Sequence, residues 1–222
     1  MSVEANWQEI QTTIEQACRN CGRDLEEVTV VAVTKYVTVE RAREALAAGI
    51  NHLGENRMKG FLEKYETIGN DAIWHFIGSL QSRKVKEIIN DVDYIHSLDR
   101  KSLAKEIDKR ADSPVSCFLQ VNVSGEESKH GMALDEVEAF VEWLEAYPNV
   151  QVIGLMTMAP HVEDEETLRG TFRKLRAMRD RIRDKQYPHA PCQELSMGMS
   201  NDYKLAIEEG ATFIRLGSSL VG

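Results

Sequence analysis

Val28-Thr29-Val30-Val31-Ala32-Val33-Thr34-Lys35 is the stretch that decides the fold. Its first six residues form a continuous run rich in β-branched side chains, which is typical of a strand buried on both faces in a parallel sheet. An open doubly wound sheet that binds a dinucleotide would carry a glycine-rich turn directly after this strand. Here the run ends in Thr34-Lys35-Tyr36 without a glycine. The stretch therefore favours a barrel over the open sheet.

Outward from this run, short β-rich segments alternate with helical ones. The expected strands cover residues 28–33, 52–54, 73–77, 94–97, 115–123, 150–156, 194–197 and 212–216. A period of 3.6 predicts helices that include residues 7–21, 38–46, 99–111, 137–144 and 168–182. Alternation of this kind implies a parallel sheet, and eight units in 222 residues leave about 28 residues for each. We predict an α/β fold, a (β/α)8 TIM barrel with an extra N-terminal helix, formed by one domain over residues 1–222.

The composition excludes several classes of protein. With 27 Lys and Arg against 36 Asp and Glu, the net charge is −9, which argues against a nucleic-acid partner. No stretch approaches the ~20 apolar residues of a membrane helix, and the acidic N-terminus lacks the apolar run of a secretory signal. We therefore expect no membrane partner and a cytoplasmic location, and we also expect a monomer. Cys18, Cys21, Cys117 and Cys192 lack the spacing of a metal site, so no metal is expected.

In a barrel of this type, functional groups gather where the strands end. The expected strand ends bring together small polar and cationic residues: Lys35, Asn56, Arg57, His75, Gly78, Ser97, Asn122, Met156, Ser196, Ser200, Arg215, Gly217 and Ser218. Two of them keep a second interpretation. His75 either lines the open end of the barrel or is a hydrogen-bonded core histidine, and Met156 either lines it or packs in the core.

Lys35 is the sharpest single candidate because it directly follows the buried run. A free lysine amine, with a pKa near 10.4, is neutral in only about one molecule in 2,500 at pH 7. A low-dielectric, cation-rich site favours the neutral amine and makes a lysine a Schiff-base nucleophile. The alternative is a lysine at a strand end whose charge reaches the solvent. The residues alone leave both open.

Two serine- and glycine-containing segments predict an anion site. Residues 196–202 open a helix for which Ser200 or Asn201 is a natural N-cap, and residues 215–219 follow the last strand. Backbone N–H groups at helix starts bind anions, and barrels often hold phosphate in the loops after strands seven and eight. Ordinary turn chemistry is the alternative interpretation.

A lone lysine and a phosphate cradle together suggest a phosphorylated carbonyl ligand, and pyridoxal 5′-phosphate fits this description. Arg215 is well placed for the ring nitrogen. Because an arginine does not give up its proton, the ring nitrogen beside it should stay unprotonated, which makes the ring a weaker electron sink. A Schiff-base aldolase acting on a phosphosugar is the alternative that the phosphate loops alone would allow.

Several segments also carry a family likeness. They are Val31–Lys35, Gly54–Asn56, His75–Gln81, Gly154–Met158, Leu195–Asp202 and Ile214–Gly217. In these segments the chain resembles the pyridoxal-phosphate homeostasis proteins, which are similar in fold to the N-terminal barrel of alanine racemase.

The resemblance implies that Lys35 holds the cofactor as an internal aldimine, that Ser200 and the Gly217-Ser218 turn contact the phosphate, and that Arg215 faces the ring nitrogen. It implies a cofactor-binding protein that balances pyridoxal phosphate supply, possesses no established catalytic reaction and has apo-enzymes as its potential partners. The expected cofactor-binding residues are Lys35, Asn56, His75, Ser97, Met156, Ser196, Ser200, Arg215, Gly217 and Ser218. No catalytic residue is assigned.

An amino-acid racemase-like enzyme is the alternative function. Racemisation needs proton donors on both faces of the α-carbon, and Lys35 serves only one. Fold-related racemases add a tyrosine from a C-terminal domain, which we expect to be missing here because the sequence ends at Gly222. Tyr36 should point away from the site if the strand pleat continues, and Tyr203 should lie on the wrong side of the ring. We therefore expect no efficient racemase.

Overall fold

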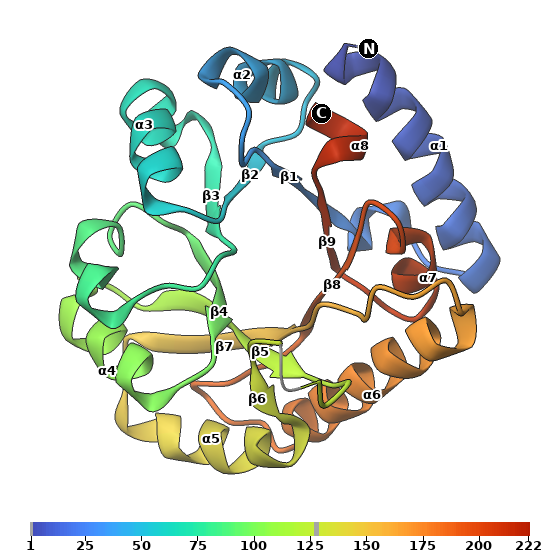
Figure 1. Cartoon of the computed structure of the whole chain (residues 1–222). Coiled ribbons are helices and arrows are strands. Elements are labelled where there is room, and N and C mark those ends of the chain that lie inside the picture. Colours follow the sequence, from blue (N-terminus) through green and yellow to red (C-terminus); the bar gives the residue numbers. More distant parts are fainter. Residues whose placement is uncertain (1, 127–128) are drawn as a thin grey trace.

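Eight parallel strands close into a barrel with helices around it (Figure 1). The structure is a computed structural model that describes residues 2–126 and 129–222. The strands follow the order β4-β3-β2-β1-β9-β8-β7-β5, and pairing of β4 with β5 closes the ring. Their bounds are β1 (Thr29–Val33), β2 (His52–Glu55), β3 (Ile73–Phe76), β4 (Tyr94–Leu98), β5 (Val115–Asn122), β7 (Val150–Met156), β8 (Glu194–Met199) and β9 (Phe213–Leu216). The predicted TIM barrel is confirmed.

Helices cover the outside of the barrel. They are α1 (Val3–Cys21), α2 (Val39–Ala47), α3 (Met58–Ile68), α4 (Lys101–Arg110), α5 (Val137–Trp143), α6 (Glu165–Asp184), α7 (Tyr203–Glu208) and α8 (Ser218–Val221). Between β3 and β4 the connection is a 3-10 segment, η3 (Ser82–Glu87). The other 3-10 turns are η1 (Leu25–Glu27), η2 (Gly69–Asp71), η4 (Leu134–Glu136) and η5 (Leu144–Ala146). Within the described ranges, no helix has the length and apolar character needed to cross a membrane.

The extra N-terminal helix is confirmed as α1, which lies beside α7 and α8 (Figure 1). Its hydrogen bond from Asn6 Nδ2 to the Leu220 carbonyl, 2.9 Å long, ties it to the last helix. Thr38 caps α2 as expected, because its hydroxyl accepts from the Arg41 N–H. The cap predicted at Asp99 is wrong. Helix α4 begins after Arg100, and Asp99 instead accepts a 2.6 Å bond from the Arg100 guanidinium.

A short strand that the sequence pattern did not reveal extends the sheet. Strand β6 (Met132–Ala133) pairs in parallel with the end of β5, with Met132 opposite Val121. Gly131 precedes it with φ near +117°, a conformation that favours glycine. Residues 131–133 therefore lie beside the end of β5, at the open end of the barrel.

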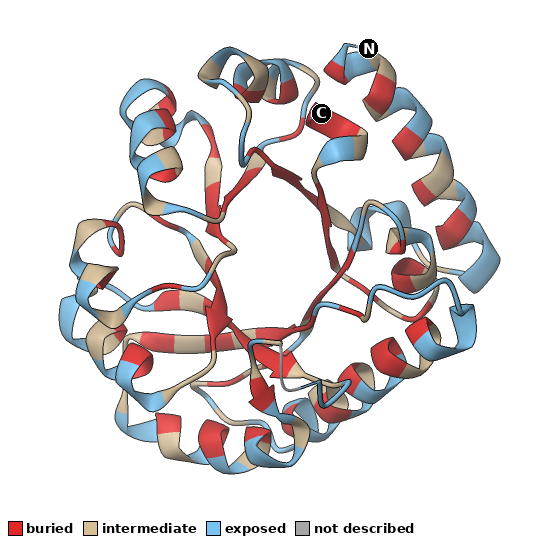
Figure 2. Ribbon diagram, viewed as in Figure 1, coloured by how far each residue is buried: buried red, intermediate tan, exposed pale blue. Residues whose placement is uncertain are grey.

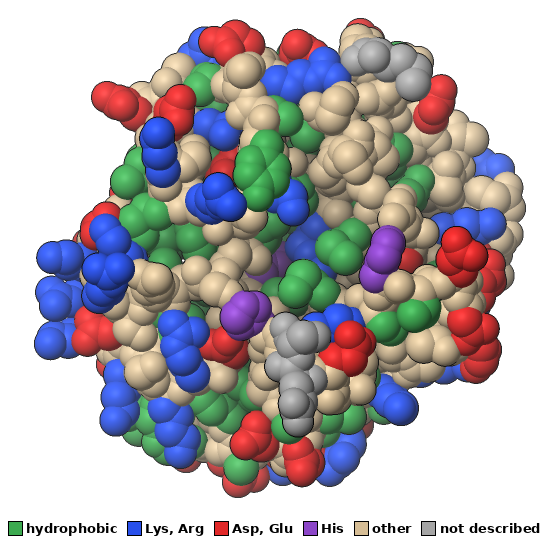
Figure 3. Space-filling model, in the orientation of Figure 1, with side chains coloured by type: hydrophobic (Ala, Val, Ile, Leu, Met, Phe, Trp, Pro, Cys, Tyr) green, Lys and Arg blue, Asp and Glu red, His purple; other side chains and the backbone are tan. Residues whose placement is uncertain are grey.

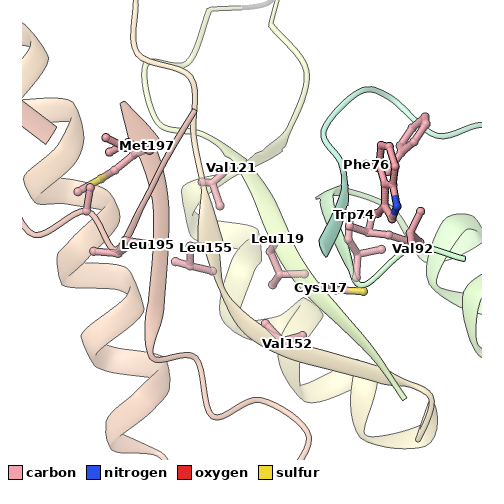
Figure 4. Close-up of a cluster of buried hydrophobic side chains, with 14 of the residues drawn as sticks. Trp74, Phe76, Val92, Cys117, Leu119, Val121, Val152, Leu155, Leu195 and Met197 are labelled. Atoms are coloured by element: carbon pink, nitrogen blue, oxygen red, sulfur yellow. The ribbon is translucent and has the colours of Figure 1, made fainter. Parts of the chain in front are cut away.

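The core has two layers, which alternate along every strand. The outer layer lies between strands and helices, and the ribbon of Figure 2 is red where its buried residues occur along the strands and helices. Figure 4 shows part of it, where Trp74, Cys117, Leu119, Leu155 and Leu195 point outward from β3, β5, β7 and β8. The inner layer fills the barrel. Its apolar members are Val31, Phe118, Met156 and Phe213, and its polar members include His75, His96, Ser196 and Arg215.

Candidate functional site

A cavity of about 500 Å³ opens where the carboxyl ends of the strands meet; we call it the mouth cavity. Figure 3 shows a hollow near the centre of this face, surrounded by hydrophobic, basic and histidine side chains. Seven of the ten predicted cofactor-binding residues line it: Lys35, Asn56, Met156, Ser200, Arg215, Gly217 and Ser218. His75, Ser97 and Ser196 are not among the residues that line it and are buried in the barrel wall or interior.

Lys35 lies on a turn at the rim of this cavity. Strand β1 ends at Val33, the Thr34 N–H still donates to the Gly54 carbonyl at 3.0 Å, and Tyr36 has φ near +68°. The turn leaves Lys35 exposed, with its Nζ 5.8 Å from the centre of the Tyr36 ring. Of the two interpretations that the sequence left open for Lys35, its exposure agrees with a lysine at a strand end whose charge reaches the solvent. The pleat argument for Tyr36 fails, since the strand does not continue; Tyr36 is 75% exposed.

Directly below this turn, a buried ion pair holds the end of β1. Thr34 Oγ1 donates to Glu55 Oε1 at 2.6 Å, and Lys64 Nζ from α3 lies 2.9 Å from the same oxygen. Both charged side chains are almost completely buried. A side chain at Gly60 would place its Cβ 2.8 Å from the other Glu55 oxygen, so it would displace this carboxylate from its present position. The ion pair therefore fixes β1, β2 and α3 to one another beneath Lys35.

Arg215 forms the floor of the cavity. It is 5% exposed, and its guanidinium donates to Ser196 Oγ at 2.6 Å and to the Thr157 carbonyl at 2.9 Å. Burial lowers the pKa of Arg215 to about 10, and the Asp202 carboxylate opposes this shift. A guanidinium has five N–H donors, so these two bonds leave donors for a ligand in the cavity.

The two loops predicted to hold an anion lie side by side. Ser219 Oγ donates to Ser200 Oγ at 2.9 Å, which joins the loop after β9 to the loop after β8. The predicted N-cap at Ser200 or Asn201 is wrong, because α7 begins after Asp202, whose carboxylate accepts a 2.5 Å bond from the Met199 N–H. Burial raises the pKa of Asp202, while that hydrogen bond and the Arg215 charge oppose the rise.

Asn56 supplies a polar group that has no partner within the protein. Among the side chains that the structure describes, the buried oxygens without a hydrogen-bond partner are Asn56 Oδ1 and Ser97 Oγ. Asn56 lines the cavity, where a ligand donor would satisfy its oxygen. Its backbone is closely packed, since a Cβ at Gly78 would lie 2.1 Å from the Asn56 carbonyl oxygen. Glycine at this position lets the loop after β3 close against the loop after β2.

Beneath Arg215, three histidines form a hydrogen-bonded chain. His96 Nδ1 lies 2.9 Å from Ser196 Oγ, His96 Nε2 lies 2.8 Å from His75 Nδ1, and His75 Nε2 lies 2.9 Å from His52 Nδ1. Burial is the main cause that lowers the pKa values of His75 and His96 well below the usual range. His75 is thus a hydrogen-bonded core histidine, one of the two interpretations that the sequence left open.

Two histidines at the cavity escaped the sequence analysis. His130 and His161 both line it, in the loops that follow β5 and β7. Both lie in loops away from the strand ends, so the position of the expected strand ends did not point to them. A larger groove of about 790 Å³ lies between α3 and η3 and shares Asn56 and Ser79 with the mouth cavity. It lacks the converging serine loops and Arg215, so the mouth cavity is the candidate site.

Comparison with known proteins agrees with this geometry. The family described as alanine racemase, N-terminal domain, matches residues 2–222. The pyridoxal phosphate homeostasis protein of Aquifex aeolicus is 44% identical over 213 residues, which are 94% of this chain and 92% of that protein.

Solved structures extend the comparison. The structure of PipY from Synechococcus elongatus with pyridoxal phosphate bound has a TM-score of 0.82 and 32% identity, over 95% of this chain and all of PipY. Alanine racemase from Corynebacterium glutamicum shares only the fold, with a TM-score of 0.73 and 13% identity over 99% of this chain and 60% of that enzyme. The chain belongs to the pyridoxal phosphate homeostasis proteins, within the family of the alanine racemase N-terminal domain.

Proposed function

We propose that this protein binds pyridoxal 5′-phosphate in the mouth cavity and acts in the cytoplasm as a monomeric, single-domain carrier that balances the supply of the cofactor to apo-enzymes. The observation that carries the proposal is that one cavity joins the amine of Lys35, the buried guanidinium of Arg215 and two adjoining serine loops. PipY, which is 32% identical to this chain, has a structure with pyridoxal phosphate bound, and this supports the same ligand here.

The residues present match the parts of this cofactor. The cofactor supplies an aldehyde, with which a lysine amine combines by losing water, and Lys35 is the amine in the cavity. Ser200, Gly217 and Ser218 would hold the phosphate through hydroxyl and backbone N–H groups. Asn56 Oδ1 offers an acceptor that has no protein partner, and Arg215 would donate toward the ring nitrogen.

The same residues suit storage better than turnover. Arg215 stays protonated near neutral pH even with a pKa of about 10, so it can donate to the ring nitrogen but does not protonate it. Lys35 is exposed at the rim, where release requires no opening of the barrel. Met156 lines the cavity and would contact the cofactor directly. His75, Ser97 and Ser196 are buried in the barrel wall or beneath the cavity, so they would support the site without lining it.

Mass mapping after borohydride reduction tests the proposal. Protein purified with the cofactor should absorb in the visible range, and reduction should place the label on Lys35. Lys35→Ala should lose the band and keep its fold, because Lys35 is exposed. Lys59→Ala is the matched control, since Lys59 lines only the neighbouring groove. A label on Lys84, Lys129 or Lys204 would refute the assignment.

A racemase-like activity is the second candidate, and one observation favours it. His130 and His161 line the cavity, and an imidazole there could supply the second proton donor that racemisation needs. No tyrosine of the described ranges lines the cavity. We expect no inversion when alanine and serine are incubated with the loaded protein in deuterium oxide. Exchange with inversion at ~1 s⁻¹ or faster would overturn the carrier function.

A further inference from the structure

The three histidines of the inner layer are more than a set of buried polar side chains. Each of them bonds to the next through opposite ring nitrogens, so that one continuous chain runs from His52 through His75 and His96 to Ser196 and Arg215. His52 is the first residue of β2 and is half-buried at the amino end of the barrel. Arg215 lines the mouth cavity at the other end. The chain thus connects the two ends of the barrel.

The bond from Arg215, together with the hydroxyl hydrogen of Ser196, favours one direction for this chain. A guanidinium only donates, so Ser196 Oγ must accept its 2.6 Å bond. The Ser196 hydroxyl hydrogen is then free to donate to His96 Nδ1. When Ser196 donates in this way, His96 donates from Nε2 to His75 Nδ1, and His75 donates from Nε2 to His52 Nδ1. In the opposite direction, the Ser196 hydrogen would have no acceptor among the described residues.

Aromatic rings shield the middle of the chain. Tyr94 stacks on His75 with ring centres 4.4 Å apart and planes 4° apart, and Phe118 lies 4.3 Å from His96. Phe213 closes the other side, 6.0 Å from the His75 ring. Because both histidines are completely buried, desolvation disfavours a charge on either of them. They therefore respond to a charge elsewhere by changing tautomer.

His52 is the member of the chain that can take up a proton from solvent. Desolvation lowers its pKa, and the neighbouring Asp93 carboxylate opposes that shift. Other titratable groups on this side are His75 on β3, Tyr94 on β4 and Glu194 at the start of β8, which acts on Tyr94. At the far end, the charged groups that face the chain are Arg215 and Asp202.

We propose that His52, His75 and His96 are positioning residues that form a relay, which passes the protonation state of His52 at the amino end of the barrel to Ser196 and Arg215 at the mouth. A proton added to His52 puts hydrogens on both of its ring nitrogens. Its Nδ1 hydrogen then meets the hydrogen on His75 Nε2 across 2.9 Å, and two donors cannot share that bond.

The clash is removed when the whole chain reverses. His75 and His96 each keep one hydrogen, which moves from Nε2 to Nδ1, and Ser196 keeps its hydroxyl hydrogen but no longer donates to His96. The only proton gained is the one on His52. Ser196 Oγ now accepts hydrogen bonds from both His96 and Arg215. The hydrogen bond between Ser196 and the Arg215 guanidinium therefore changes. The inference concerns the protein without ligand and goes beyond the proposed function.

Nitrogen-15 spectra of the histidine rings test the relay in the free, full-length protein, since ring nitrogens with and without hydrogen differ in chemical shift. At pH 8 we expect all three histidines to carry their hydrogen on Nε2. As His52 takes up its proton, His75 and His96 should change to Nδ1–H with the same midpoint. A His96 tautomer that stays constant while His52 titrates, or an Nδ1–H form at pH 8, would overturn the relay.

Two variants sharpen this test. His52→Phe removes the titrating end, so the tautomers of His75 and His96 should no longer change with pH. His189→Gln is the matched control, because His189 bonds to the Val141 carbonyl outside the chain and the coupled change should persist. A coupled change that survives in His52→Phe would refute the proposal. If His52→Phe does not fold, the titration of the wild-type protein tests the relay by itself. Both measurements use the protein without ligand, so their outcome does not depend on pyridoxal phosphate binding.

Discussion

The outer and inner layers of this barrel solve the same packing problem in different ways. The outer layer, between strands and helices, is almost entirely apolar, as in the cluster of Figure 4. The inner layer has a small apolar cluster of four residues, with Tyr94 and Ile153 packed against it, and it also holds His75, His96, Ser196 and Arg215. The difference indicates that the outer layer supplies most of the stability, whereas the inner layer builds the floor of the site.

The two layers should therefore respond differently to substitution. Apolar contacts are non-directional, and their loss scales with the volume that is removed. A hydrogen-bonded chain depends on complete pairing, because a buried group that loses its partner costs about 1–3 kcal/mol. The position of a residue in the chain should then matter more than its size.

The largest effect is expected in the outer layer. Phe61 on α3 is completely buried, and its ring packs 5.4 Å from the Trp74 ring. Phe61→Ala should lower the free energy of unfolding by about 3–5 kcal/mol, through lost burial and the cavity that remains. The next residue, Leu62, is 39% exposed, so Leu62→Ala should cost less than about 1 kcal/mol. Urea unfolding measures both, and equal losses would contradict the assignment of α3 to the core.

A smaller effect is expected from removing the middle of the histidine chain. His75→Phe keeps a ring of similar size but leaves His52 Nδ1 and His96 Nε2 without a partner, which should cost about 2–4 kcal/mol. His52→Phe leaves only His75 Nε2 unpaired and should cost about half as much. Urea unfolding at pH 8 compares the two. A greater loss for His52→Phe would show that position in the chain does not matter.

The sequence predicted which faces of the strands and helices form the outer layer, but it did not predict the contacts within the inner layer. The continuous apolar run over 28–33 and the 3.6-residue period of the helices predicted the barrel, because they reflect which faces are buried. In a parallel sheet, however, a helix separates neighbouring strands, so cross-strand register leaves no local signal. The alignment of His52, His75 and His96 on adjacent strands is set by that register. The sequence could therefore offer His75 only as core or mouth.

The sequence predicted those site residues that lie at or just after the ends of the strands. Lys35, Ser200, Arg215 and Gly217 do line one cavity, since strands of known direction bring their carboxyl ends together. The sequence left the exposure of Lys35 open between two interpretations, and it did not indicate the turn with positive φ at Tyr36, because no residue preference points to it. The Glu55–Lys64 pair was likewise hidden, since it joins a strand end to the middle of a helix.

The inner layer should also make stability depend on pH. The pKa values of His75 and His96 in the folded protein are lowered well below the value near 6.5 expected in the unfolded chain. Below pH 6.5 the unfolded state therefore binds more protons, so stability falls as pH falls. From pH 7 to 5.5 these two residues should remove about 2.5 kcal/mol. Urea unfolding across this range should show a loss that is about 1.3 kcal/mol smaller in His75→Phe, which is half the share of these two residues, and an equal loss in both proteins would exclude His75 as a cause.

The smallest effect is expected at the mouth, where Ser219 joins the two serine loops. Its hydroxyl donates to Ser200 Oγ, and neither serine belongs to the apolar core. Ser219→Ala should change the free energy of unfolding by less than about 1 kcal/mol, because the loops remain hydrated. If these loops hold the phosphate, losing the bond frees Ser200 and should weaken pyridoxal phosphate binding by up to about tenfold, which corresponds to ~1.4 kcal/mol. Titration of the visible absorbance measures the affinity, with Ser82→Ala in η3 as the matched control. Equal affinities in the two variants would remove Ser219 from the site, and a stability loss as large as that of His75→Phe would place this bond with the core.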